Sequence, residues 1–157
     1  MTKSTDIKNF IAKSKRNQTD RFPHSDVVIS YLRTNKKLLI KILTDVYTNN
    51  PDWWNWKQNH SAEKEAKQVC QDILDNKLDK GTQTTIACIY YGLQISLEKL
   101  DLQKGLIKIH DYWAYITYHY ENGVKEKRKN QFIPFSRLTN KEKFKDLDWI
   151  YAVYRSL

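Results

Sequence analysis

Glycine and proline are scarce in this chain, with 4 Gly and 3 Pro among 157 residues. Because these residues supply most tight turns, their scarcity favours long uninterrupted elements. The glycines also fit neither GxGxxG nor GxxxxGK[ST], the two patterns whose backbone amides cradle phosphate groups. Both of these classes of phosphate-binding loop are therefore excluded.

Cysteine and histidine are rare as well. Cys70 and Cys88 form no CxxC pair and fall on apolar helical stripes, so we predict that both are small buried hydrophobes in a reducing compartment. The 4 histidines are scattered, and no two have the His-x-x-x-His spacing of a helical metal site. We therefore expect no metal and no cofactor.

Long apolar runs are also missing. No run approaches the roughly 18 residues that suggest a membrane-spanning helix. The segment from Met1 to Asn17 is polar and basic and has no apolar centre, so it does not read as a signal peptide. We expect a cytoplasmic protein without a membrane partner.

The sequence shows no catalytic constellation. It has no GxSxG pattern and no cysteine signature of a nucleophile. Asp146 and Asp148 are a close pair of carboxylates, but residues two apart on a helix do not face each other. We therefore predict that the protein is not an enzyme.

Positive charge is abundant, with a formal net charge of +9 and a pI of about 9.4. This balance favours anionic partners such as nucleotides, nucleic acid, acidic protein surfaces or anionic lipid. Most of the excess comes from lysine, which is strongly hydrated, so solvated surface charge without a partner is the alternative.

Apolar residues recur at helical spacing along most of the chain, which predicts an all-α fold of about five to seven helices. The clearest helix begins at Ser61, and we expect Lys80-Gly81 to end it. Thr139 and Glu142 have the spacing of a capping box and predict a last helix that runs to about Arg155. We expect this helix to bury Phe144, Leu147, Ile150, Tyr151 and Tyr154.

One segment leaves two structures open. Tyr115 to Tyr120 is β-branched and aromatic, and Asn122-Gly123 is a strong hairpin signal, so a short β-hairpin near 115–133 is the alternative to a helix. We find no repeat, no linker and no domain boundary. The sequence therefore predicts a single domain over 1–157, with a flexible basic N-terminus over 1–20.

Three features are candidates for binding. Trp53, Trp54 and Trp56 stand beside Lys57 and offer stacking surfaces or an interaction surface, although tryptophan more often anchors a core. The loop from Lys125 to Lys129 is basic, as many solvated faces are. The tyrosines of the segment from Tyr112 to Tyr120 point in all directions around a helix, so some must face solvent or a pocket.

The last fifty residues resemble a ryanodine-receptor repeat (RyR) domain, over about residues 106–155. That family combines a His-x-x-Trp helix, a loop, a short Leu-Val-Pro-Tyr-like anchor and a Leu-x-x-x-x-Lys-x-x-Asp start of the last helix. The corresponding residues here are His110 to Trp113, Phe132 to Leu138, and Thr139 to Asp146. The chain lacks the Gly-Trp-x-x-Gly of the family loop and the His-Pro before the anchor, and Phe135 replaces the tyrosine.

The resemblance implies a ligand groove between the His-x-x-Trp helix and the anchor, and a role in sensing nucleotide-derived ligands. In such a groove, aromatic rings would stack a base and cations would meet phosphates. The residues that we expect to contact the ligand are His110, Trp113, Tyr120, Arg128, Lys129, Phe135 and Arg137.

We therefore predict a non-enzymatic binding protein for a nucleotide-type small anion, serving as a signal sensor or sponge in a phage–host conflict. One alternative is a protein-interaction module that inhibits a host nucleic-acid or defence enzyme through an acidic surface of that enzyme. The other is a DNA- or RNA-binding protein that uses a basic face. The sequence leaves open whether the protein forms a homo-oligomer.

Overall fold

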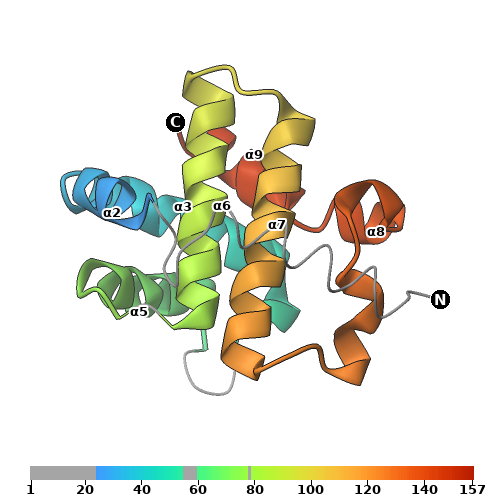
Figure 1. Cartoon of the computed structure of the whole chain (residues 1–157). Helices are drawn as coiled ribbons and strands as arrows, with labels where there is room; N and C mark the ends of the chain where they lie inside the picture. Colours follow the sequence, from blue (N-terminus) through green and yellow to red (C-terminus); the bar gives the residue numbers. More distant parts are fainter. Residues whose placement is uncertain (1–23, 55–59, 78) are drawn as a thin grey trace.

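The fold is an assembly of packed helices, shown in Figure 1. The computed structural model describes residues 24–54, 60–77 and 79–157. These residues form α-helices and short 3₁₀ helices and contain no strand, which confirms the predicted all-α class and the number of helices. The α-helices are α2 (Ser25–Arg33), α3 (Lys36–Asn49), α5 (Ala62–Leu74), α6 (Lys80–Leu97), α7 (Leu102–Glu121), α8 (Asn140–Lys143) and α9 (Leu147–Ser156), and the 3₁₀ helices are η1 (Pro51–Trp53), η2 (Glu126–Gln131) and η3 (Phe135–Arg137).

Several helices begin at a side chain that accepts a hydrogen bond from the first turn. Such a cap satisfies one of the backbone N–H groups that have no partner within the helix. The prediction that Ser61 begins a helix is confirmed. The caps and their oxygen–nitrogen distances are Ser61 at 3.1 Å, Asp79 at 2.8 Å, Asp101 at 3.0 Å and Thr139 at 3.3 Å.

The prediction that Lys80-Gly81 ends α5 is wrong, because these two residues begin α6. α5 ends at Leu74, and Asn76 follows in the left-handed conformation with a φ of 62°. The Lys77 N–H then donates to the Asp72 carbonyl over 2.8 Å. This pattern closes a helix through its last carbonyl groups, and Asn takes the left-handed conformation more readily than most residues.

The β-hairpin near 115–133 does not form. α7 continues to Glu121, and Asn122 then adopts the left-handed conformation with a φ of 54°. The Gly123 N–H donates to the Tyr118 carbonyl over 3.0 Å. The Asn-Gly pair therefore ends a helix here, because the aromatic residues before it, including Tyr112 and Tyr115, are buried on the α7 surface.

Helix α6 is the centre of the packing. It lies along α7, with which it forms the antiparallel pair in the middle of Figure 1, and it also packs on α9. α3 packs on α5 and on α9, so the main core joins the N-terminal and C-terminal helices. Gly92 allows α9 to approach α6 closely, since a Cβ atom built there would lie 2.9 Å from a Val153 methyl group.

The last predicted helix is interrupted. α8 ends at Lys143 and α9 begins at Leu147, so the two segments have different directions. Ile150 is buried as predicted, whereas Phe144, Tyr151 and Tyr154 are 52%, 47% and 69% exposed, and their predicted burial is wrong. The break allows α9 to turn its Trp149, Ile150 and Val153 face toward the core instead.

Candidate ligand-binding site

Helix α7 presents His110 and Trp113 one turn apart. Their rings lie 6.0 Å apart between centroids and are nearly parallel, at 16°. The Nε2 atom of His110 lies 2.7 Å from the Ile133 carbonyl oxygen. Because a carbonyl only accepts, Nε2 carries the proton and donates. Burial lowers the pKa of His110, so the ring is neutral at pH 7.

The anchor from Phe132 to Leu138 packs on this face of α7. Phe132 is fully buried, and its ring centroid lies 5.4 Å from that of Trp113. Phe135 is buried, and its ring centroid lies 6.4 Å from that of His110. The two rings and the bond to Ile133 hold the anchor in one place along the helix.

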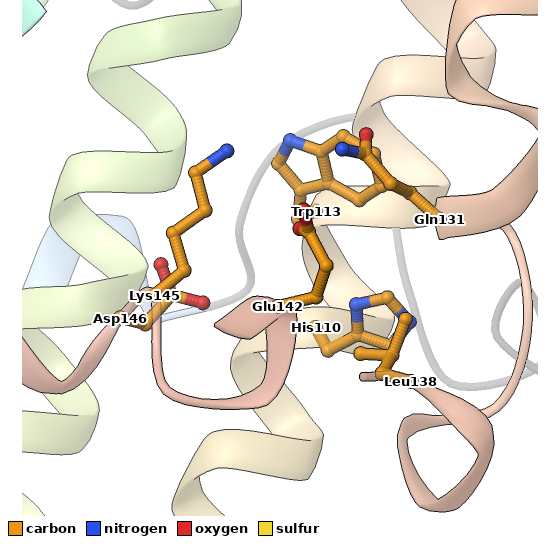
Figure 2. Close-up of a pocket in the computed structure, with 7 residues that line it drawn as sticks. All are labelled: His110, Trp113, Gln131, Leu138, Glu142, Lys145 and Asp146. Carbon is orange, nitrogen blue, oxygen red and sulfur yellow. The ribbon is translucent and has the colours of Figure 1, made fainter. Parts of the chain in front are cut away.

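A small pocket opens where α7, the anchor and α8 meet, and we call it the inner pocket (Figure 2). The cavity volume of the inner pocket is about 60 Å³. At about 10–15 Å³ for each water, this is room for about four to six waters, on the scale of one nucleobase. The lining residues are His110, Trp113, Gln131, Leu138, Glu142, Lys145 and Asp146.

Asp146 is the most perturbed acid of the inner pocket. It is half-buried, and loss of hydration raises its pKa to about 6. The negative charge of Glu142 raises the pKa further, and the positive charge of Lys145 opposes both effects. Across the part of the chain that the structure describes, the Asp146 carboxylate has no hydrogen-bond or ion-pair partner.

Glu142 forms only one half of the predicted capping box. Its backbone N–H donates to the Thr139 hydroxyl, so one half of the box is confirmed. The return bond from the Glu142 carboxylate to the backbone of Thr139 is not formed within the described ranges, and the side chain lines the inner pocket instead. The inner pocket therefore holds two carboxylates beside an aromatic wall, and neither has a hydrogen-bond or ion-pair partner among the described residues.

A wider recess adjoins the inner pocket, and we call it the outer pocket. The cavity volume of the outer pocket is about 540 Å³. The two pockets share Gln131 and Glu142. Its cations are Lys127 and Arg137. The other lining residues are Asn130, Ile133 and Thr139. The combined site thus has an aromatic end with two carboxylates and the Lys145 ammonium, and an open end with two cations and the shared Glu142.

Three of the seven predicted ligand contacts line these pockets, namely His110, Trp113 and Arg137. Phe135 and Tyr120 do not line either pocket. Phe135 is buried in the core, and the Tyr120 hydroxyl accepts a hydrogen bond from the Gln83 amide of α6 over 3.0 Å.

The other two predicted cations also lie outside both pockets. Arg128 donates to both Glu121 carboxylate oxygens, at 2.9 and 3.1 Å, and stands 6.0 Å from the Trp113 ring centroid. Lys129 pairs with Glu126 over 3.7 Å. Both are therefore engaged in contacts that support the η2 segment.

The site also contains residues that the sequence analysis did not assign to it. The sequence indicated Asp146 as a neighbour of Asp148 and as the end of the family motif, and Glu142 as a capping residue. Their common signal is a pair of acids four residues apart, which a continuous helix would place on one face. The helix break between α8 and α9 brings them to the pocket together.

The tryptophan cluster does not form the alternative interaction surface as a unit. Trp54 is 9% exposed, and its indole N–H donates to the Tyr47 carbonyl over 3.0 Å, so this residue belongs to the core. Trp53 is 39% exposed. Trp56 and Lys57 lie outside the described residues, as does the predicted basic N-terminus over 1–20.

Comparisons with protein-family models, with curated proteins and with solved structures return no match for this chain. The resemblance to the RyR domain therefore stays a prediction. Over the described ranges, no group of three or more His, Cys, Asp or Glu side chains is placed to hold a metal ion. No helix in those ranges combines the length and apolarity needed to cross a bilayer.

Proposed function

We propose that this protein binds a nucleotide-type small anion without transforming it, and that it acts as a sensor or sponge for that ligand. The base would occupy the inner pocket and the phosphates the outer pocket. The observation that carries the proposal is the distribution of charge in the site. The aromatic end has two carboxylates and the Lys145 ammonium, and the open end has Lys127 and Arg137 beside the shared Glu142.

The physical chemistry of a nucleotide matches this distribution. A base has flat faces that stack on Trp113 and N–H groups that need acceptors, whereas phosphates are anions that favour Arg137 and Lys127. The outer pocket alone falls within the range of about 300–1,000 Å³ that is typical of small-molecule sites. The net charge of +9 also favours the approach of an anion.

The site is also held in place by contacts that do not depend on a ligand. The bond from His110 to Ile133 and the packing of Phe132 on Trp113 fix the anchor against α7. A site that is formed in advance loses less conformational entropy when it binds. This favours small-ligand binding over a protein-interaction module, since Trp54 is in the core.

A thermal-shift screen of the full chain tests this proposal, with nucleoside mono- and diphosphates, cyclic dinucleotides, ADP-ribose-type compounds and short oligonucleotides. A ligand at about a hundred times its Kd adds about 2.7 kcal/mol of stability. For a domain of this size, that corresponds to a rise in melting temperature of about 5–10 °C.

The lysines of η2 provide a matched control. We expect Lys127→Gln to weaken binding of the responding nucleotide and Lys129→Gln to leave it unchanged, because only Lys127 lines the outer pocket. A screen in which no small nucleotide responds would refute the proposal. A response to oligonucleotides alone, falling steeply with salt, would favour nucleic-acid binding instead.

A further inference from the structure

The acidic side of the inner pocket favours hydrogen-bond donors. Glu142 and Asp146 both line it, and neither carboxylate has a partner across the described ranges. An ionised carboxylate accepts hydrogen bonds and cannot donate them. A ligand edge that presents carbonyl oxygens or phosphates there would leave these acceptors without partners and add repulsion, which costs binding free energy.

The wall of the pocket requires a flat ligand. Trp113 and His110 present nearly parallel rings, and the Nε2–H of His110 is already used by the Ile133 carbonyl. The neutral imidazole therefore contributes a stacking surface and adds no positive charge beside the carboxylates. The matching ligand is one heteroaromatic ring system whose edge carries adjacent N–H groups.

Common nucleobases differ in this edge. Guanine has an N–H and an amino group side by side, so it offers adjacent donors to carboxylate oxygens. Adenine and cytosine place a ring acceptor beside the amino group, and uracil places its single N–H between two carbonyl oxygens. The guanine carbonyl follows next along the same edge, where the Lys145 ammonium and the Gln131 amide of the pocket lining can donate to it.

We infer, on the basis of the proposed function, that the inner pocket recognises a guanine-type base through Glu142 and Asp146 while Trp113 stacks on its face. The ligand of the whole site is then a guanine nucleotide whose phosphates extend toward Arg137 and Lys127. In this assignment the two acids select the base, and the two cations supply affinity that does not depend on the base.

Isothermal titration calorimetry of the full chain with guanosine, inosine, adenosine and uridine monophosphates tests this assignment. Inosine monophosphate lacks only the exocyclic amino group of guanine. A well-made bidentate contact to a base discriminates by about 1–3 kcal/mol, which is about 5- to 150-fold in Kd. We expect guanosine monophosphate to bind best, inosine monophosphate to bind at least about 5-fold more weakly, and uridine monophosphate to bind weakest.

Matched variants separate this inference from the proposed function. Asp146→Asn and Glu142→Gln should each remove the preference for guanosine over inosine monophosphate, whereas Asp148→Asn should retain it because Asp148 does not line either pocket. Far-UV circular dichroism and the melting temperature establish that each variant is folded.

The outcomes of the titrations are distinct. Equal affinity for the four nucleotides, weakened alike by Lys127→Gln, would overturn the choice of base and leave the proposed function in place. A preference for adenosine or uridine monophosphate would likewise overturn it. Failure of all four compounds to bind, together with a negative thermal-shift screen, would remove the proposed function itself.

Discussion

Replacing Asp146 by Asn should stabilise the protein although the residue lines the candidate site. Burial raises the pKa of this carboxyl from its ordinary value of 3.8 to about 6. The folded chain therefore disfavours the charged form of Asp146, which is the form that prevails at pH 7. Asparagine has nearly the same shape and carries no charge, so the variant avoids the penalty.

The size of the effect follows from the two pKa values. A difference of about 2.2 pH units, at about 1.36 kcal/mol for each unit, sets an upper limit of about 3 kcal/mol. Asp146 is only half-buried and keeps part of its contact with water, so we expect about half of this limit, about 1.5 kcal/mol. For a domain of this size, that raises the melting temperature by about 3–6 °C.

The pH dependence gives a second signature. Between pH 4 and pH 6 the folded chain keeps a proton on Asp146 that the unfolded chain has lost, so the free energy of unfolding falls as the pH rises through this window. Above about pH 6 the penalty is constant. Two charged groups shift the pKa of Asp146, namely Lys145, which lowers it, and Glu142, which raises it. His110 lines the same pocket, and the negative charge of Asp146 helps to raise the pKa of the buried Cys88 thiol.

The assay is urea unfolding of the wild type, of Asp146→Asn and of the control Asp148→Asn at several pH values from 4 to 8. We expect the Asp146→Asn variant to be more stable at pH 7 and to lose this contribution to the slope between pH 4 and pH 6. An unchanged slope together with an unchanged stability at pH 7 would show that Asp146 is hydrated in the folded protein. The same variant should bind its ligand less well, which separates the roles of this residue in stability and in binding.

Four further substitutions test the packing and capping of the helices. Gly92→Ala should lower the free energy of unfolding by about 1–3 kcal/mol in a urea titration, because the new methyl group clashes with Val153. Gly81→Ala is the control. Its methyl group makes only ordinary contacts, so the substitution should raise the free energy of unfolding by about 0.5–1 kcal/mol because alanine favours the helix. Thr139→Ala removes the cap of α8 and should cost about 0.5–2 kcal/mol by the same measurement, with a loss of ligand affinity from the loosened pocket wall. Trp54→Phe removes the indole donor to the Tyr47 carbonyl, which among the described residues then keeps only the Asn50 N–H at 3.3 Å. The loss of this buried hydrogen bond should lower the melting temperature by about 1–6 °C, and an unchanged value would show that the indole bond does not stabilise the core.

Much of the helical architecture was predictable from the sequence because it depends on neighbouring residues. Ser61 caps α5 and both cysteines are buried, as local pattern and periodicity indicated. Asn122-Gly123 shows the limit of local information, since the same pair can close a hairpin or end a helix. Burial of the preceding aromatic residues against α6 decides for the helix.

The candidate site illustrates the same division. The sequence indicated His110, Trp113 and Arg137, and the structure places all three along the two pockets. The acids of the inner pocket were indicated only by their spacing of four residues, and that spacing does not tell whether their shared face lies at a pocket or in solvent.

Local sequence by itself determined the helical class and the helix starts at Ser61 and Thr139, since these depend on hydrogen bonds and periodicity within a few residues. The residues of the aromatic wall were indicated by the family resemblance and not by periodicity. Only the tertiary structure decided which charged side chains face the pocket. That choice depends on where the chain breaks between α8 and α9 and on how the anchor packs against α7, and both result from contacts between residues far apart in the sequence.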